Sequence, residues 1–195
     1  VMYNCTLRFG DVPVFWLPML TWSLKDDYPP LLLTVGRTSR WGYYVLSGTS
    51  WHLTDSATLT AHLDWREKRG FGFGADVGYN LGDSGSGRLR DYYIDDHNPV
   101  TDINPAGGPD INRYRVQWQH KQAVTDNLDF TADINEQSDV NVIRDFFPRE
   151  FSLDREPDNL LDLTARGANA TASVLVRPPI NDFFAARIPI NGSNV

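Results

Sequence analysis

The sequence has one cysteine and four histidines, so it offers few of the side chains that bind metals or form covalent bonds. Cys5 alone cannot form an intrachain disulfide, and the histidines show no ligand spacing such as HxxxH. We expect Cys5 to be a small buried residue rather than a reactive thiol. We predict no metal site, no cofactor and no catalytic centre, and therefore no enzymatic activity.

Long apolar runs are also absent. The longest, residues 12–20, is about half as long as a membrane-spanning helix, and Pro13 and Pro18 interrupt it. This run and the mean hydropathy of −0.38 argue against a helical membrane protein. They remain compatible with a membrane β-barrel, because a barrel strand needs only about ten residues and half of them face a polar interior.

Basic residues are outnumbered. The chain has 18 Lys and Arg against 25 Asp and Glu, a formal net charge of −7. Proteins that bind nucleic acids normally carry a basic patch, so we expect no nucleic-acid partner. The sequence begins without a signal peptide and runs directly into strand-like sequence, so we expect it to be an internal segment of a longer precursor if it is exported.

Alternation of apolar and polar residues is abundant. It repeats every two residues, the period of a β-strand, and the apolar residues never keep a helical spacing for long. In the clearest run, residues 71–82, aromatic and aliphatic residues alternate with Gly, Asp and Asn. The other runs are 41–53, 57–66, 114–119, 128–135, 161–165 and 168–176. We predict an all-β fold, an antiparallel meander of long strands.

Turn residues separate these runs, at 54–56, 68–70, 83–87 and 125–127. The segment 95–112 contains three prolines and is predicted to be a long loop. Its Asp95-Asp96-His97 group is the best candidate for a catalytic cluster, and we expect it to be a solvated turn. Residues 2–9 and 12–17 predict two short strands around Gly10-Asp11, so we divide the chain into residues 1–30, a linker 31–40 and a sheet 41–195.

Two features favour a membrane barrel over a soluble β-sandwich. Strands of ten or more residues exceed the five or six that are usual in soluble sandwiches. One face of the run 71–82 carries Gly72, Gly74, Asp76, Gly78 and Asn80, small residues that suit a crowded or water-filled lumen. We predict that these five residues face a lumen. Aromatic residues near strand ends would form an interfacial girdle: Trp41, Trp51, Trp65 and Tyr79.

Several motifs resemble, in order, the LPS-assembly protein (LptD) family. Residues 10–18, GDVPVFWLP, are similar to the signature that closes its periplasmic jelly-roll domain. Residues 57–70 resemble its second barrel strand and the following turn, and residues 113–120, RYRVQWQH, resemble a later strand. Two further elements are similar to residues 138–146 and 180–189. Each motif alone is weak, whereas the ordered set covers most of the chain.

The resemblance implies that residues 1–30 end a jelly roll, that 31–40 form a linker, and that 41–195 form the first part of an outer-membrane β-barrel. The family passes lipopolysaccharide from an LptA-like periplasmic bridge, through a barrel plugged by an LptE-like lipoprotein, into the outer leaflet. We therefore expect residence in the outer membrane of a Gram-negative bacterium, in contact with its lipid, with the N-terminal part periplasmic. Strand 12–17 could supply an apolar groove for the lipid chains through Val14, Phe15, Trp16 and Leu17.

The sequence departs from the family at two places. Prolines that are thought to weaken the lipid exit in its first two barrel strands correspond here to positions near Gly48 and Ala61. Gly48 could loosen a strand and Ala61 could not. Whether these two residues form a gate is therefore left undecided by the sequence. The disulfide-forming cysteines of the family are not matched by Cys5. Counting strands from the linker also places the loop 95–112 on the periplasmic side, where barrel loops are usually short. Either a strand near 88–94 is miscounted, or this loop is an exception.

Two other functions remain open. A soluble carbohydrate-binding β-sandwich could use exposed aromatics such as Trp41, Trp51 and Trp118 to stack on sugars. A different outer-membrane barrel, such as a porin or a fatty-acid channel, has the same alternation, but the GDVPVFWLP stretch argues against it.

Overall fold

The computed structural model of the chain describes residues 2–9, 11–20, 31–99, 112–154 and 158–181. The side chains at positions 7, 9, 12, 14, 15 and 17–20 lie outside that description. The described residues form two antiparallel sheets and two short α-helices, α1 (Val142–Phe146) and α2 (Pro148–Leu153). The predicted antiparallel β-fold is confirmed, and the helices are an addition that strand periodicity did not predict. Neither helix is long and apolar enough to cross a membrane.

The first sheet is a hairpin of β1 (Met2–Phe9) and β2 (Val12–Leu20), with its turn at the predicted place. Cys5 lies in β1 and is only partly buried, contrary to expectation. The physical reason is that a two-stranded sheet without a described layer over it encloses few side chains.

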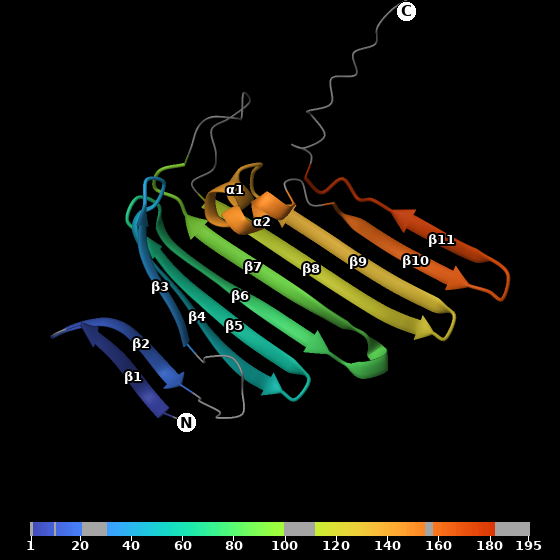
Figure 1. Cartoon of the computed structure of the whole chain (residues 1–195), viewed down its shortest axis with the longest axis horizontal. Coiled ribbons are helices and arrows are strands. Elements are labelled where there is room, and N and C mark those ends of the chain that lie inside the picture. Colours follow the sequence, from blue (N-terminus) through green and yellow to red (C-terminus); the bar gives the residue numbers. More distant parts are fainter. Residues whose placement is uncertain (1, 10, 21–30, 100–111, 155–157, 182–195) are drawn as a thin grey trace, which may run out of the picture.

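The second sheet is a meander of nine strands, each paired antiparallel with its sequence neighbours (Figure 1). The strands are β3 (Leu31–Thr38), β4 (Gly42–Thr54), β5 (Ala57–Arg66), β6 (Gly70–Asn80), β7 (Ser86–Asp95), β8 (Asn112–Thr125), β9 (Leu128–Gln137), β10 (Leu160–Arg166) and β11 (Thr171–Val176). A one-turn 3₁₀-helix, η1 (Gly82–Ser84), joins β6 to β7. Since β3 and β11 end the strand order, the sheet of described strands is open.

Two strands lie where alternation alone predicted none. β3 occupies most of the expected linker 31–40, where it pairs with β4 along its whole length. β7 occupies the segment near 88–94, and the charged residues Arg88, Arg90 and Asp91 obscure its alternation. Five strands, β3 to β7, therefore precede the connection that follows residue 95. Because five is an odd number, that connection begins at the end of the sheet opposite to the start of β3.

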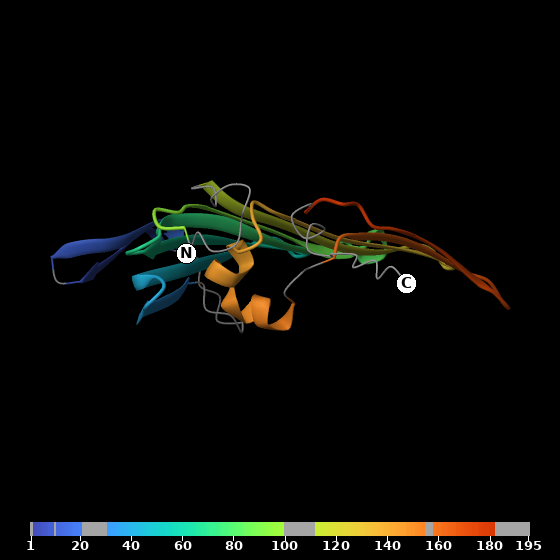
Figure 2. The ribbon, with the colours of Figure 1, turned by 90° about the horizontal axis from the view of Figure 1, so that it is seen from above.

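The sheet is a single curved layer with both helices on one face (Figure 2). Paired residues share a face, so the register assigns each side chain to one of two surfaces. The polar face, under the helices, carries His62, Asp64, Arg66, Asp76, Arg88, Arg90, Arg113, Arg115, Gln117, Gln119, Asp133 and Asn135. The apolar face carries large exposed side chains, including Leu63, Trp65, Phe71, Phe73, Leu89, Tyr114, Val116, Leu163 and Val174. Among the described residues no second sheet covers this apolar face.

A small core lies between the helices and the sheet. It consists of Tyr92, Ile94, Val142, Ile143 and Phe146. Phe147 and Phe151 pack at its edge. Helices of five and six residues are unstable in isolation, so contact with this core holds α1 and α2 in place.

The two ends of the sheet have different connections. At one end, turns of two to five residues join β4 to β5, β6 to β7, β8 to β9 and β10 to β11. Two connections that begin at the other end are long, with 16 residues between β7 and β8 and 22 residues between β9 and β10. The second of these contains α1 and α2, so we call this the helix end and the opposite end the short-turn end.

Candidate functional site

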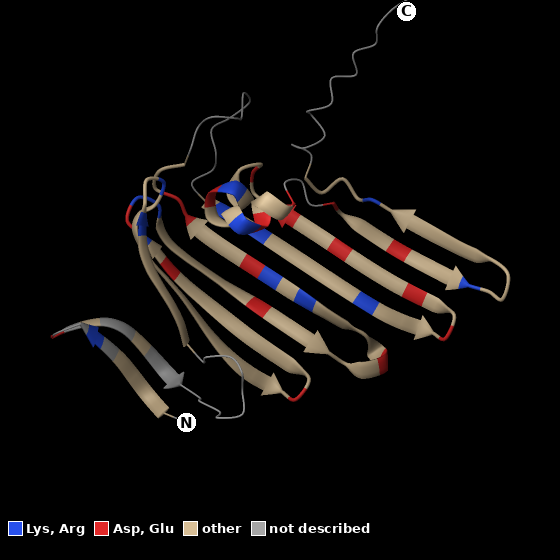
Figure 3. Ribbon diagram, viewed as in Figure 1, with Lys and Arg blue, Asp and Glu red and all other residues tan. Residues whose placement is uncertain are grey.

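The polar face gathers its charges near the helix end. Figure 3 shows basic residues along β7 and β8 in the middle of the sheet, and acidic residues on the flanking strands. The ion pairs near the helices form two groups. A buried cluster lies under α1, and a half-exposed group lies beside α2.

The buried cluster consists of Arg66, Arg69, Arg113, Asp64, Asp96, Asp139 and Asp145. Arg113 is at its centre and is fully buried. Its Nε and Nη2 each donate to Asp139 at 2.8 Å. Its Nη1 donates to Asp96 Oδ2 at 2.8 Å and to Asp145 Oδ2 at 2.9 Å. One guanidinium from β8 thus joins three carboxylates from three different segments.

Arg69, in the turn between β5 and β6, completes this arrangement. Its Nη1 donates to both oxygens of Asp96, at 3.0 and 3.2 Å, and its Nη2 lies 3.1 Å from Asp145 Oδ2. Asp96 and Asp145 are therefore each shared by two buried arginines. Sharing of this kind compensates the large cost of removing a carboxylate from water.

A second pair in the cluster involves Arg66 and Asp64 on β5. Arg66 Nη2 donates to Asp64 Oδ2 at 3.1 Å, and the Tyr92 hydroxyl donates to the same oxygen at 3.0 Å. Arg66 Nη1 in turn donates to Tyr92 Oη at 2.6 Å. The four carboxylates of the cluster face its three guanidinium groups, and the half-exposed Arg40, 3.7 Å from Asp145 Oδ1, supplies a fourth positive charge.

The ring of Phe146 on α1 lies among the three buried arginines. Their guanidinium carbons, in Arg66, Arg69 and Arg113, are 5.2, 5.4 and 5.1 Å from the ring centroid. These are cation–π distances, which are more stabilising when the cation is removed from water. Trp41 adds a further link, because its Nε1–H donates to the carbonyl oxygen of Asp145 at 2.8 Å. The cluster therefore fixes α1 to residues from several strands and turns.

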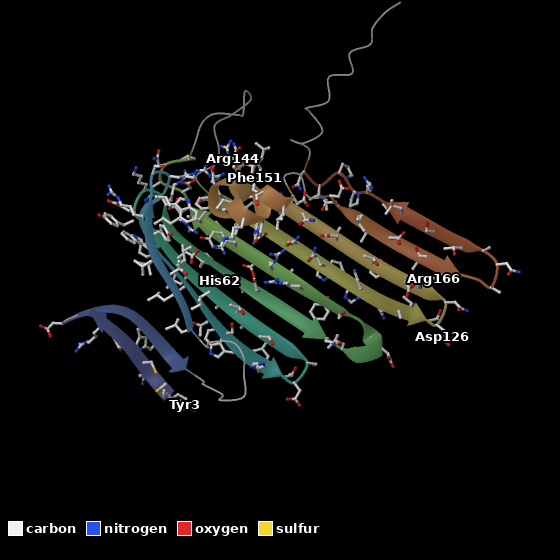
Figure 4. All side chains as sticks on the ribbon, in the orientation of Figure 1. Tyr3, His62, Asp126, Arg144, Phe151 and Arg166 are labelled. Carbon is white, nitrogen blue, oxygen red and sulfur yellow. The ribbon has the colours of Figure 1, made fainter. Side chains whose placement is uncertain are left out.

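The half-exposed group is centred on Glu150 of α2. Arg115 Nη1 donates to Glu150 Oε2 at 2.5 Å, and Arg115 Nη2 donates to Oε1 at 3.2 Å. Arg90 Nη1 lies 3.3 Å from Oε1, and Arg90 Nη2 also donates to the side-chain oxygen of Gln117. The Arg115 guanidinium carbon lies 3.4 Å from the centroid of the Phe147 ring. Figure 4 shows the labelled Arg144 and Phe151 at the helices, with His62 lower on the polar face.

The residues predicted to face a lumen all lie on the polar face of β6. A Cβ atom at Gly72 would overlap the hydroxyl of Tyr92, and one at Gly74 would lie 3.0 Å from its ring. These glycines therefore leave room for Tyr92 to cross the sheet toward Arg66. Asp76 pairs with Arg88 at 2.6 Å and lies 3.7 Å from His62 Nε2. That this face lines a lumen remains a prediction for Gly72, Gly74, Asp76, Gly78 and Asn80.

The predicted groove residues lie in β2. The side chains of Val14, Phe15 and Leu17 fall outside the described residues. Trp16 is described and is 58% exposed. A lipid groove on this hairpin therefore remains a prediction.

The predicted gate residues lie in different strands from those expected. Because β3 begins the sheet, Gly48 is in its second strand and Ala61 in its third. Gly48 lies on the polar face and lines a groove together with Leu32, Leu46 and His62. Ala61 lies on the apolar face, opposite Thr49 and Ala75. Neither position is assigned a gating role by its contacts.

The expectation of a solvated turn at Asp95-Asp96-His97 is wrong for Asp96. Asp95 and His97 are exposed, but Asp96 is fully buried because Arg69 and Arg113 enclose its carboxylate. In the described part of the chain, no three His, Cys, Asp or Glu side chains are arranged to hold a metal ion.

The buried cluster was not predicted, although signals for it were present. Arg69, Arg113, Asp139 and Asp145 each belong to a motif that carries the family resemblance. Arg69, Arg113 and Asp139 are in or next to a strand and Asp145 is in α1, and for each of these ionic residues a solvated position is the ordinary explanation. Only their convergence, which spans the sequence from Trp41 to Phe146, distinguishes them from surface charges.

Comparison with known proteins connects these features to one family. No protein-family profile matches the chain. LPS-assembly protein LptD of Shewanella sp. (strain ANA-3) is 28% identical over 82% of this chain and 20% of its own length. LptD of Vibrio cholerae is 28% identical over 73% of the chain and 18% of its own length, and LptD of Aliivibrio fischeri is 23% identical over 73% of the chain and 17% of its own length. The resemblance to LptD is confirmed, and the chain spans about a fifth of the length of these curated relatives.

Proposed function

We propose that this chain is part of an outer-membrane protein of a Gram-negative bacterium that assembles lipopolysaccharide into the outer leaflet. In this proposal the nine-stranded sheet is a section of a transmembrane β-barrel. The observation that carries it is the two-faced sheet, with charged side chains on one face and large apolar side chains on the other, which no second sheet of described strands covers. Strands β4 to β9 have ten to fourteen residues each, the length that a barrel strand needs.

The aromatic residues of the apolar face support a membrane environment. Trp65, Phe71, Phe73, Tyr93 and Tyr114 lie toward the helix end. Trp51, Tyr79 and Trp118 lie toward the short-turn end. Residues 71 and 79 are about 27 Å apart along a strand, close to the roughly 25 Å apolar band of an outer-membrane barrel. The two groups of aromatic residues would then form the girdles that contact the lipid head groups on either side of the apolar band.

The connections support a direction for the sheet. Outer-membrane barrels have short periplasmic turns and longer extracellular loops, so the short-turn end would be periplasmic. β3 begins at this end, since Leu31 pairs with Thr49 and Thr38 pairs with Gly42. A linker from a periplasmic jelly roll would therefore enter from the expected side. With β3 counted, the loop 96–111 moves to the extracellular side, which removes the difficulty raised by the sequence.

The partners follow from the same proposal. The polar face would be the lumen wall, through which phosphorylated sugars pass and against which an LptE-like lipoprotein would sit. The hairpin β1–β2 would end the jelly roll that receives lipopolysaccharide from an LptA-like bridge. The outer-membrane lipid would contact the apolar face.

A soluble sugar-binding sandwich has less support. Trp41, one of its candidate stacking residues, is 9% exposed and is bound to α1. Trp118 donates from Nε1 to the Tyr79 hydroxyl at 3.1 Å. A sandwich would also need a second sheet over the apolar face, and the described residues provide none.

Two neighbouring residues of β6 offer a matched test. Val77 lies on the apolar face, whereas Gly78 lies on the polar face, where a Cβ atom would meet open space. In the protein expressed from its complete gene, Val77→Arg should lower the unfolding free energy by roughly 1–3 kcal/mol in lipid, because Val77 lies between the middle of the apolar band and the girdle at Tyr79. Gly78→Arg should change it little. Urea titrations in lipid vesicles would measure both.

Outer-membrane fractionation and surface labelling of lipopolysaccharide complete the test. Val77→Arg should reduce the amount of protein in the outer membrane and the lipopolysaccharide that reaches the cell surface. Equal effects of the two substitutions would contradict a lipid-facing apolar surface.

A further inference from the structure

We propose that Arg90 and Arg115 form an anion-binding site on the polar face, that Glu150 of the same chain occupies it, and that a phosphorylated sugar head group displaces Glu150. The inference rests on the proposed function, because the head group must pass along this face. The site itself is argued from the contacts of the described residues.

The two arginines converge on one carboxylate in the manner of an anion site. Arg115 binds both oxygens of Glu150 through its two terminal nitrogens, and Arg90 approaches Oε1 from the adjacent strand. Paired contacts between a guanidinium and two oxygens are equally suited to a carboxylate and to a phosphate. A phosphate could therefore replace the Glu150 carboxylate without a change in the arginine positions.

The site has more donors than Glu150 uses. The Nε–H of Arg115 is buried and has no hydrogen-bond partner among the described residues. The side chain of Gln137, only 5% exposed, also lines this site, and neither its nitrogen nor its oxygen has a described partner. Buried polar groups without partners are costly. A ligand with three or more oxygens could accept hydrogen bonds that the two oxygens of Glu150 cannot.

Glu150 is held in a way that permits exchange. Its side chain is 39% exposed, and it lies on a helix of six residues. Leu153, at the end of the same helix, is 89% exposed. Rotation of the Glu150 side chain alone would return its carboxylate to water, so displacement does not require Phe151 to leave the edge of the core.

The space beside the arginines fits a head-group fragment. A cavity of about 180 Å³ lies beside Glu150, between the polar face and the helices. Its lining includes Arg90, Arg115, Gln117, Asn135 and Gln137, the apolar residues Ile143 and Leu153, and the acidic residues Glu136 and Asp154. Pockets for whole drug-sized ligands are larger, about 300–1,000 Å³. The cavity therefore suits a phosphate on one sugar and is too small to enclose the acyl chains.

The test uses the protein expressed from its complete gene and purified in detergent. Binding of glucosamine 1-phosphate, inorganic phosphate and unphosphorylated glucosamine is measured by titration calorimetry. Glu150→Gln removes the competing carboxylate and should tighten binding of glucosamine 1-phosphate about tenfold, as expected if the site is free about a tenth of the time. Arg115→Gln should abolish binding. Asp126→Asn, which removes an exposed carboxylate from the turn between β8 and β9 at the short-turn end, is the control and should have no effect.

Hydrogen exchange provides a second measurement on the unmutated protein. Glucosamine 1-phosphate should accelerate amide exchange in residues 148–153 and leave residues 142–146 unchanged. This measurement decides the question even if Glu150→Gln fails to fold. Equal binding of phosphate and glucosamine 1-phosphate would keep the anion site but overturn its assignment to a head group.

Absence of tighter binding in Glu150→Gln, together with unchanged exchange in residues 148–153, would overturn the site itself. Both measurements are made in detergent on the purified protein. Their failure is thus distinct from failure of the Val77→Arg and Gly78→Arg test, which concerns the membrane.

Discussion

Two consecutive short helices each place a carboxylate against arginines of the same sheet, but in different surroundings. Asp145 of α1 is 1% exposed and lies among Arg69, Arg113 and Arg40. Glu150 of α2 is 39% exposed and lies between Arg90 and Arg115. The first carboxylate is enclosed, and the second can return to water. The difference shows how one loop can be both fixed to the sheet and open to exchange.

The physical basis is the cost of burying charge. A buried ion pair roughly balances its own desolvation, but removal of one partner leaves an uncompensated charge that is expensive. An exposed pair contributes little, because water replaces either partner. Loss of an ion-pair partner in the buried cluster should therefore destabilise α1 strongly. Loss of a partner in the half-exposed group should affect α2 little.

The largest expected effect comes from removal of the central arginine of the buried cluster. Arg113→Met removes the guanidinium that binds Asp139 and leaves Arg69 as the only buried arginine described at Asp96 and Asp145, so it should lower the unfolding free energy by about 3–5 kcal/mol. The matched substitution Arg115→Met should cost less than half as much, because Glu150 can turn to solvent. Urea titrations of the complete protein in detergent would measure both. Similar losses for the two variants would remove the distinction between the two groups.

A smaller effect is expected when each carboxylate is replaced by its amide. Asp145→Asn weakens charged hydrogen bonds to two buried arginines and should cost about 1.5–3 kcal/mol. Glu150→Gln should cost no more than about 1 kcal/mol, since this pair is partly exposed. Thermal unfolding of both variants, compared with the unmutated protein, checks the order. A larger loss for Glu150→Gln would show that α2, not α1, anchors the loop.

The smallest expected effect is that of salt. Raising sodium chloride from about 50 to 500 mM shortens the screening length severalfold and weakens exposed ion pairs. Amide exchange in residues 148–153 should accelerate about twofold, because the Glu150 pairs are screened. Exchange in residues 142–146 should not change. Equal acceleration in both helices would indicate that the loop opens as one unit.

Much of the fold was predictable because its signals are local. The runs in residues 41–82 predict β4, β5 and β6 together with their turns, and the motif 113–120 lies within β8. Alternation does not reveal β7, because Arg88 and Arg90 lie on the polar face while the adjacent Asp91 places a charge on the apolar face. It does not reveal β3 either, because the apolar residues of β3 follow a proline-rich stretch that is typical of a linker.

The candidate site was far less predictable. Gly72 and Gly74 lie on the predicted strand, but their close approach to Tyr92 depends on the neighbouring strand. Asp96 was expected in water, and the two arginines that enclose it come from positions 69 and 113. No local sequence pattern predicts a contact between residues so far apart in the chain.

The sequence by itself determined most of the strands, their turns and the division of each strand into two faces. A period of two residues fixes which side chains share a face, whatever the strand pairs with. Only the tertiary structure decided which charges meet, because that depends on strand register and on the return of the connection 138–159 over the sheet. Trp41 and Asp145, 104 residues apart, are in contact for this reason. The same return encloses Asp145 and leaves Glu150 at the edge of the cavity, within reach of water.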